Sequence, residues 1–371
     1  SGKTLAYNLP ILNALLSIPK ATALYLYPTK ALSQDQLSGL SDLISSSGIE
    51  GFIKPAIFDG DTPQGQRNAI RNTANILKTN PDMLHQGILP HHTAWHRFLS
   101  HLRFVVIDEA HIYRGVFGSH FANVLRRLKR VCAFYGSFPQ FILTSATIGN
   151  PQELAENLIE SDVQLIDQDG SQHGEKQFII YNPPFVDRQL GIRKSAVITG
   201  VNFSKTLIEN SHQTLIFART RRTVEMLLSY LRDSLPYQER DKVRGYRSGY
   251  LKKERRDIES RFRSGELKAV VSTSALELGI DIGDLESVIL IGYPGSIATT
   301  IQRVGRAGRH NQSSLAILVP APDALDQYLA VYDVAQSDLD HAQVVSVLHA
   351  LDSITALLAE AANRAQPVRL E

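Results

Sequence analysis

The chain has 371 residues, 43% of them hydrophobic, which indicates two domains with buried cores. Its net charge of +2 gives no case for a generally basic, nucleic-acid-coating surface, so any such site must come from local clusters. The single cysteine, Cys132, excludes an internal disulfide and a cysteine-built zinc site, and the absence of a long apolar run excludes a membrane span of the usual length. The lone cysteine favours a protein of the reducing cytoplasm.

Short apolar runs rich in β-forming residues alternate with helical patterns along the chain. We expect strands at residues 23–27, 104–107, 140–144, 213–217, 269–272, 288–291 and 315–319. Continuous apolar strands separated by helices are typical of parallel sheets covered on both faces. The rhythm loosens before residue 213, so we expect one domain at 1–185, a second at 186–330 and a helical tail at 331–371.

The chain opens with Ser1-Gly2-Lys3-Thr4, and a helical pattern follows at residues 5–16. This matches the second half of a phosphate loop, in which the lysine contacts phosphates and the hydroxyl binds Mg²⁺. The helix N-terminus adds to the attraction for anions. Four residues are a weak match by themselves.

Two adjacent carboxylates, Asp108 and Glu109, directly follow the predicted strand at 104–107. The carboxyl end of a parallel strand is where α/β sheets bind ligands. We predict that Asp108 binds Mg²⁺, that Glu109 polarises an attacking water, and that His111 links them to a neighbouring segment. Acids that favour a helix dipole are the alternative.

Ser145-Ala146-Thr147 follows the predicted strand at 140–144. Hydroxyl groups at a strand end can hydrogen-bond the acids and shift with nucleotide state. A helix N-cap ahead of Pro151 is the alternative interpretation.

Three arginines and two glycines occupy residues 302–309. On the first turns of a helix, Arg306 and Arg309 would project from one face. Two guanidinium groups in one pocket indicate a dense anion such as a triphosphate. A solvated basic helix is the alternative.

Two further patterns lie elsewhere in the chain. Glycines in residues 113–118 predict a shaped loop, and apolar spacing at 344–358 predicts an amphipathic helix.

In this order the motifs resemble a superfamily 2 helicase core, and more closely the MrfA-like (YprA-type) DEXH helicases. The resemblance extends from Ser1 to about Tyr328. It is carried by residues 2–4, 28–32, 79–85, 108–111, 113–120, 145–147, 275–283, 302–309 and 325–328.

The resemblance implies an α/β fold with two tandem RecA-like (P-loop NTPase) domains, each a mostly parallel sheet flanked by helices. It implies ATP and Mg²⁺ in the cleft between them. Arg306 and Arg309 would act as arginine fingers, and His111, Ser145 and Thr147 would couple hydrolysis to movement. The residues that match ATP-contacting positions of the family are Ser1, Gly2, Lys3, Thr4, Asp108, Glu109, Gly279, Asp281, Gln302, Arg306 and Arg309, with Thr4 and Asp108 as the Mg²⁺ ligands.

The resemblance also implies ATP-driven 3′→5′ movement along single-stranded DNA and a role in DNA repair. We also expect a monomeric protein. A catalytically impaired nucleic-acid-binding remnant and an RNA helicase stay open as alternatives. The positions that match nucleic-acid contacts are Pro28, Thr29, Lys30, Gly60, Thr79 and Pro81 in the first domain, and Arg219, Arg247, Ser248, Gly249 and Thr273 in the second.

Two departures from the family concern the ends of the chain. The family has phosphate-loop glycines upstream of the position of Ser1, and it continues into a cysteine-rich zinc domain where this chain has an alanine-rich tail without cysteine. We therefore expect the chain to lack N- and C-terminal parts of the family.

Overall fold

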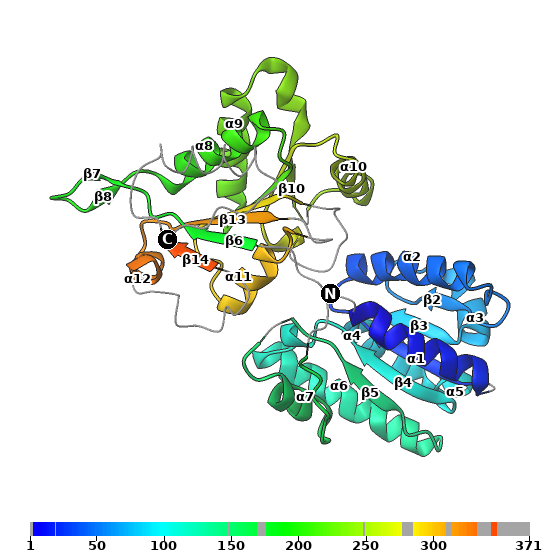
Figure 1. The fold of residues 1–371 in the computed structure, drawn as a ribbon. Coiled ribbons are helices and arrows are strands. Elements are labelled where there is room, and N and C mark those ends of the chain that lie inside the picture. Colours follow the sequence, from blue (N-terminus) through cyan, green and yellow to red (C-terminus); the bar gives the residue numbers. More distant parts are fainter. Residues whose placement is uncertain are drawn as a thin grey trace. The chain divides into compact units, whose positions relative to one another are not determined.

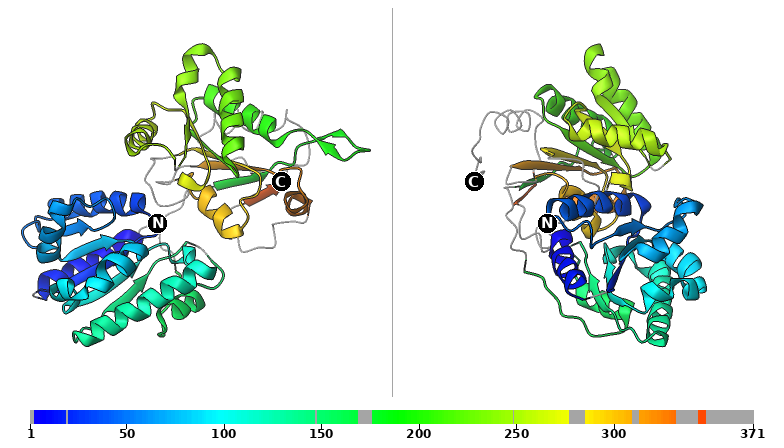
Figure 2. Two further views of the ribbon diagram at one scale, coloured as in Figure 1. Left: turned by 180° about the vertical axis from the view of Figure 1, so that it is seen from behind. Right: turned by 90° about the vertical axis from the view of Figure 1, so that its right-hand side faces the viewer.

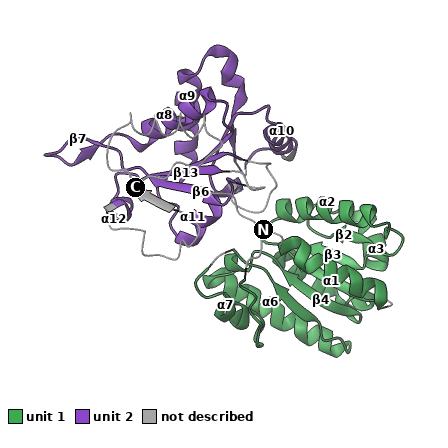
Figure 3. Cartoon of the chain, viewed as in Figure 1, with its two compact units in different colours: residues 1–171 green, residues 172–371 purple. Residues whose placement is uncertain are grey.

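The computed structural model describes residues 3–18, 20–146, 148–168, 176–247, 249–276, 285–308, 313–331 and 343–346. The chain divides into two compact units, residues 1–171 and 172–371 (Figure 3). Within the described residues, the helices are too short or too polar to cross a bilayer.

Unit 1 is built around a parallel sheet with the strand order β2-β3-β1-β4-β5 (Figure 1). The strands are β1 (Thr22–Leu26), β2 (Pro55–Ile57), β3 (Ile76–Thr79), β4 (Leu102–Ile107) and β5 (Gln140–Leu143). The helices are α1 (Lys3–Ser17), α2 (Lys30–Ser46), α3 (Gln64–Thr73), α4 (Pro81–Met83), α5 (His96–Leu99), α6 (Gly115–Phe134) and α7 (Pro151–Ile159), with short turns η1 (Leu84–Ile88), η2 (Leu89–Trp95) and η3 (Ala110–Ile112).

Alternation along the strands of unit 1 sends neighbouring side chains to opposite faces of the sheet. Leu24, Leu77 and Val105 pack in a core that includes residues of α6 and α7. Tyr25 and Ile76 pack in a second core that includes residues of α1 and α2. Since all strands are parallel, their carboxyl ends meet at one edge, where ligands bind in α/β sheets.

Unit 2 contains a second parallel sheet with the order β10-β11-β9-β12-β13-β6-β14. Its strands are β6 (Lys176–Ile180), β9 (Thr214–Ala218), β10 (Val243–Tyr246), β11 (Ala269–Ser272), β12 (Ser287–Ile291), β13 (Ser314–Val319) and β14 (Gln343–Ser346). Its helices are α8 (Ala196–Glu209), α9 (Arg221–Ser234), α10 (Lys252–Arg263), α11 (Ile297–Val304) and α12 (Ala324–Val331), with turns η4 (Tyr237–Lys242) and η5 (Ser274–Leu276).

A two-stranded hairpin, β7 (Phe185–Asp187) and β8 (Ile192–Arg193), projects from unit 2 in Figure 1 and in the left view of Figure 2. The carboxylate of Asp187 accepts hydrogen bonds from the backbone N–H groups of Gln189 and Leu190, at 2.8 and 3.0 Å, and so fixes the turn. Val186 and Leu190 are 74% and 72% exposed. The hairpin is therefore ordered by its backbone and turn contacts rather than by a core.

The two parallel sheets confirm the predicted fold class, and all the predicted strands are present, with ends that differ from the prediction by at most two residues. The division between the units lies ahead of the predicted boundary at 185/186, because β6 pairs with β13 and β14 of the second sheet. The predicted tail helix is wrong at residues 343–346, which form strand β14 beside β6. Two β-branched residues, Val344 and Val345, favour that conformation. The rest of the predicted tail helix lies outside the described residues.

One core position of unit 1 carries a charge. Lys78 in β3 is fully buried, and burial lowers its pKa from 10.5 to about 7 against the opposing effect of the Asp108 and Asp35 carboxylates. The unfolded chain therefore binds more protons than the folded chain between these pH values. The penalty for burying Lys78 is complete below pH 7 and decreases as the pH rises toward 10.5.

Lys78→Met is accordingly expected to raise the free energy of unfolding by about 1–4 kcal/mol at neutral pH, with a gain that shrinks toward pH 9.5. Urea unfolding followed by circular dichroism at pH 6.5, 8 and 9.5 would measure it. Ile76→Met, on the same face of the same strand, should show no such pH dependence. An equal gain for Lys78→Met at all three pH values would contradict the assigned cause. The tyrosines that face Lys78, Tyr25 and Tyr27, are present in both proteins and cancel in the comparison.

Candidate active site

The two predicted catalytic acids follow β4 at the carboxyl edge of the unit 1 sheet. Oδ1 of Asp108 accepts hydrogen bonds from the Thr144 hydroxyl and from the backbone N–H of Glu109, the latter at 3.0 Å. Burial raises the pKa of Asp108, while these hydrogen bonds and the charges of Lys3 and Lys78 oppose the rise. The carboxylate is thus held in one orientation, in a setting that favours a nearby cation.

Glu109 is connected through His111 to the segment after β5. The backbone of Glu109 has φ 53° and ψ 46°, a left-handed conformation that is uncommon for a residue with a side chain and often occurs at functional sites. Nδ1 of His111 lies 3.4 Å from Oε2 of Glu109 and accepts the backbone N–H of Ala146 at 3.2 Å. One ring nitrogen cannot accept and donate at once, so the proton position on His111 decides which contact forms.

Lys3, at the start of α1, lies at the same edge as the acids. Its ammonium donates a hydrogen bond to the main-chain carbonyl of Ser145, and its charge lowers the pKa of Asp108. Thr4 follows in the first turn of α1 and is half-buried. The structure therefore brings together Lys3, Asp108 and Ser145, although they are far apart in the sequence. Ser1, Gly2 and Thr147 lie outside the described residues.

The predicted nucleic-acid contacts of unit 1 lie at the carboxyl ends of β1, β2 and β3 or within a few residues after them. The backbone N–H of Tyr27 donates to the carbonyl of Thr79 at 3.0 Å, and the Thr79 hydroxyl donates to the carbonyl of Phe58 at 2.6 Å. These bonds place the loop with Pro28 beside the loop with Pro81.

The side chain of Lys30 joins the loop after β1 to the loop after β2. Its Nζ lies 3.3 Å from Oδ1 of Asp61, and a Cβ added at Gly60 would lie 3.3 Å from the same nitrogen. Thr29 is the N-cap of α2, with its hydroxyl accepting the N–H of Leu32 at 3.3 Å. The segments that carry the six predicted contacts of unit 1 are thus connected to one another, with Thr79 and Pro81 buried beneath them.

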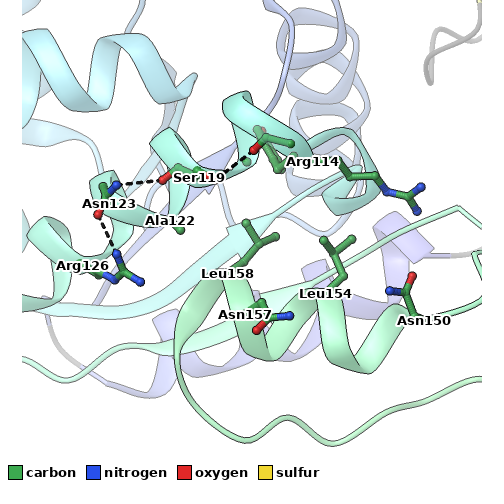
Figure 4. Close-up of a pocket in the computed structure, with 12 residues that line it drawn as sticks. Arg114, Ser119, Ala122, Asn123, Arg126, Asn150, Leu154, Asn157 and Leu158 are labelled. Atoms are coloured by element: carbon green, nitrogen blue, oxygen red, sulfur yellow. Dashed lines mark hydrogen bonds between the residues drawn. The ribbon is translucent and has the colours of Figure 1, made fainter.

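A hollow of about 470 Å³ lies between α6 and α7, with Arg114 and Arg126 toward its two ends and Leu154 and Leu158 between them (Figure 4). The loop predicted at 113–118 is shorter than expected, because α6 already begins at Gly115. A Cβ at Gly118 would lie 2.4 Å from the carbonyl oxygen of Tyr113, so this turn requires glycine.

The arginine cluster of unit 2 differs from the predicted helical arrangement. Helix α11 ends at Val304, and Arg306 follows it, with its backbone N–H donating to the carbonyl of Arg303 at 3.1 Å. Gly308 has φ 76°, and its backbone N–H donates a hydrogen bond to the carbonyl of Leu285 at 2.9 Å. The chain therefore leaves the helical path here. The expectation that Arg306 and Arg309 share a helix face is therefore wrong for Arg306, and Arg309 lies outside the described residues.

Both described arginines of this cluster are nearly buried. Arg303 and Arg306 are each 6% exposed, and the guanidinium of Arg303 lies 5.0 Å from the centroid of the Phe217 ring. Gln302 is half-buried in the last turn of α11. A solvated basic helix, the alternative interpretation, is excluded for these two arginines.

Arg219 follows β9 and forms ion pairs with two carboxylates that sequence reasoning did not single out as its partners. They are Asp323 at 2.5 Å and Asp326 at 3.3 Å. Asp326 also accepts the backbone N–H groups of Tyr293 and Ala321, at 2.9 and 2.7 Å. The sequence signal that could have revealed these partners is the Asp-x-x-Asp pattern after β13. In the sheet, β13 is separated from β9 only by β12.

The other predicted nucleic-acid contacts of unit 2 follow neighbouring strands. Arg247, after β10, forms an ion pair with Glu225 at 2.9 Å and lies 4.8 Å from the centroid of the Tyr250 ring. Thr273 follows β11, and nothing lies within 4 Å of a Cβ added at Gly249. Ser248, Gly279 and Asp281 lie outside the described residues.

One unit has a lysine, paired acids and a hydroxyl-bearing segment at one sheet edge, and the other has a buried arginine cluster. Two parallel-sheet units of this kind are the fold expected of a two-domain P-loop NTPase. Residues 1–154 match the DEAD/DEAH box helicase family, and residues 199–311 match the helicase conserved C-terminal domain. The chain therefore belongs to the superfamily 2 helicases, as the sequence motifs predicted.

Among its relatives, the uncharacterized ATP-dependent helicase YprA of Bacillus subtilis is 51% identical over 89% of this chain. The ATP-dependent helicase hrq1 of Schizosaccharomyces pombe is 41% identical over 88% of it. The crystal structure of the DUF1998 helicase MrfA bound to DNA matches 88% of this chain with a TM-score of 0.84 and 50% identity. The chain spans 44% of the YprA length, 32% of the hrq1 length and 44% of the MrfA chain.

Proposed function

We propose that this chain is the motor core of an ATP-dependent DNA helicase that couples ATP hydrolysis to 3′→5′ movement along single-stranded DNA, in DNA repair. The observation that carries the proposal is the convergence of Lys3, Asp108, Glu109 and Ser145 at one sheet edge, with His111 joining the acids to the segment of Ser145. The relatives named ATP-dependent helicases support ATP as the nucleotide, and MrfA, solved with DNA, supports DNA.

The residues present fit ATP with Mg²⁺. A fixed carboxylate at Asp108 and a hydroxyl at Thr4 are the hard oxygen donors that Mg²⁺ prefers. When bound, the metal neutralises phosphate charge. Lys3 would bind the β- and γ-phosphates as a point charge, and Glu109 would orient and polarise the attacking water. We propose that Arg306 and Arg309, as arginine fingers, and Gln302 act on the nucleotide, and that Gly279 and Asp281 contribute to binding it, so that hydrolysis depends on unit 2 as well as on unit 1.

The coupling from hydrolysis to movement is assigned to His111, Ser145 and Thr147. The shared Nδ1 of His111, within 3.4 Å of Glu109 and bonded to Ala146, supports this assignment. A change in the protonation or contacts of Glu109 can exchange the contact of His111 with Ala146 for the contact with Glu109. The segment after β5 would then move.

The nucleic acid is proposed to cross the connected segments of unit 1 that carry the six predicted contacts and the strand ends of unit 2 that carry Arg219, Arg247, Ser248, Gly249 and Thr273. Hydroxyls, backbone N–H groups and few cations suit phosphate contacts without base readout. Arg219, already held by Asp323 and Asp326, contributes hydrogen-bond donors with little net charge. This is consistent with a net charge of only +2.

The direct test is ATP hydrolysis by the full-length protein with single-stranded DNA, single-stranded RNA or no polymer. We expect DNA to stimulate hydrolysis and RNA to do so less. Stronger stimulation by RNA would favour the RNA helicase. DNA binding without ATP hydrolysis would favour the impaired remnant. Sedimentation of the DNA complex tests the proposed monomer, and displacement of a 3′- or 5′-terminal block tests the polarity.

Thr144→Val is expected to raise the Mg²⁺ concentration that half-maximally supports hydrolysis by about tenfold. It removes the hydroxyl that donates to Asp108, so the carboxylate is less well oriented and its pKa rises further. Thr73→Val, at the exposed end of α3, is the matched control. An unchanged Mg²⁺ requirement would show either that Asp108 does not bind the metal or that Thr144 is not needed to orient Asp108.

A further inference from the structure

A charged side chain occupies the centre of the unit 1 core. Lys78 is 0% exposed and pairs in register with Tyr25 of the neighbouring strand β1. Ile76, two residues earlier in β3, belongs to the apolar core that includes residues of α1 and α2. Burying an ammonium is strongly unfavourable unless hydrogen bonds and charge compensate it, and an aliphatic side chain would pack here without that cost.

The contacts of the Lys78 side chain tie three elements together. Its Nζ donates a hydrogen bond of 2.6 Å to the carbonyl of Gln36 in α2. The same atom lies 5.5 Å from the ring centroids of both Tyr25 and Tyr27, near the end of β1. The carboxylate charges of Asp108 and Asp35 favour its protonated form. One buried amino group therefore contacts β1 and α2 from β3, and in its protonated form it interacts electrostatically with the predicted metal ligand.

The main chain around Lys78 connects the same loops. Its carbonyl accepts the N–H of Phe58 at 2.9 Å, just before the loop with Gly60, and the next residue, Thr79, accepts the N–H of Tyr27 at 3.0 Å. Helix α2, whose Gln36 carbonyl accepts the hydrogen bond from Lys78, begins at Lys30. The loops after β1, β2 and β3 thus all start from segments that Lys78 contacts, and these loops carry the predicted nucleic-acid contacts.

We propose that Lys78 is a positioning residue that holds the three nucleic-acid-contacting loops of unit 1 in register with one another and with Asp108, so that nucleic-acid binding stimulates ATP hydrolysis. The stimulation part rests on the proposed function. The positioning part does not, because it concerns the order of the loops in the free protein. Lys78 touches neither nucleotide nor nucleic acid in this scheme and acts through α2, Tyr25 and Tyr27.

Lys78→Met is the decisive variant, because it keeps the volume, removes the buried charge and should stabilise the fold. Its control is Ile76→Met, a similar change on the same face of β3. In wild-type protein and both variants, hydrogen exchange at the amides of Tyr27 and Phe58 reports loop order without any ligand. Titration of ATP hydrolysis with single-stranded DNA, and separately with ATP, reports coupling.

For Lys78→Met we expect exchange at these two amides to be about tenfold faster than in Ile76→Met, although global unfolding is harder. We expect the half-saturating DNA concentration to rise about tenfold, with the KM for ATP changed less than twofold. A lysine that is only a structural anchor would give slower exchange and normal DNA titration in Lys78→Met, and that result would overturn the proposal. Faster exchange together with no DNA stimulation of the wild type would leave the positioning role intact and overturn the proposed motor.

Discussion

Glu109→Gln is expected to lower DNA-stimulated ATP hydrolysis by about 10²–10⁴-fold while ATP still binds. The amide keeps the size of the side chain but cannot take the proton of an attacking water. The surroundings prepare this group for such a role, since the left-handed backbone of Glu109 turns it out of the β4 ladder and His111 lies 3.4 Å away. Initial rates of phosphate release at saturating DNA would measure the loss, and a fluorescent ATP analogue would measure binding.

Glu153→Gln is the matched control, since Glu153 is an exposed acid in the first turn of α7 that accepts a hydrogen bond from Asn150 at 2.9 Å. It should hydrolyse ATP at the wild-type rate. Activity of Glu109→Gln within tenfold of the wild type would assign the water-orienting role to another group. Loss of ATP binding in the same variant would assign Glu109 to the binding site instead.

The strands that the sequence predicted are those with uninterrupted apolar runs, such as β4, β9 and β12. Strand β3 was not predicted, because Lys78 and Thr79 interrupt its apolar run and a buried lysine contradicts the usual pattern. Strand β10 was missed for a similar reason, since Arg244 and Gly245 stand in its centre. Pairing with neighbours in the sheet overrides local composition at these positions.

The residues at the candidate site were predictable because parallel strands gather their carboxyl ends at one edge. Motif order and this topology together predicted the neighbourhood of Lys3, Asp108 and Ser145. The contacts themselves were not predictable. The choice of His111 Nδ1 for Ala146, and the capture of Arg219 by Asp323 and Asp326, depend on side-chain rotamers and on loops that carry no periodic signal.

The arginine cluster shows a different limit of sequence reasoning. Spacing of three residues predicted one helix face, but Gly305 caps α11 and Gly308 takes a positive φ, so the helix stops first. A glycine-rich segment after a helical pattern is a stop signal as much as a continuation. The predicted functional role of the arginines therefore stays a prediction, whereas the predicted helix through Arg306 is wrong.

Arg306→Ala is expected to lower DNA-stimulated hydrolysis by about 10³-fold or more, the usual loss for an arginine finger. Arg306 is 6% exposed and follows α11 in unit 2, whereas Lys3 and Asp108 belong to unit 1, so the effect would show that hydrolysis needs both units. ATP affinity should change little, because the finger stabilises charge that develops during transfer. Arg306→Lys should also lower the rate of DNA-stimulated hydrolysis by more than tenfold, because lysine keeps the charge but lacks the planar guanidinium group.

Rates of phosphate release with and without DNA, together with nucleotide and DNA affinities, separate the possible outcomes for Arg306. Arg222→Ala, at the exposed start of α9, is the control and should behave as the wild type. If Arg306→Ala hydrolysed ATP normally, the cluster would be a structural part of unit 2, packed like Arg303 on Phe217. If only DNA affinity fell, Arg306 would belong to the nucleic-acid surface. A loss of rate at unchanged affinities would place it at the transferring phosphate and show that hydrolysis requires a residue of unit 2.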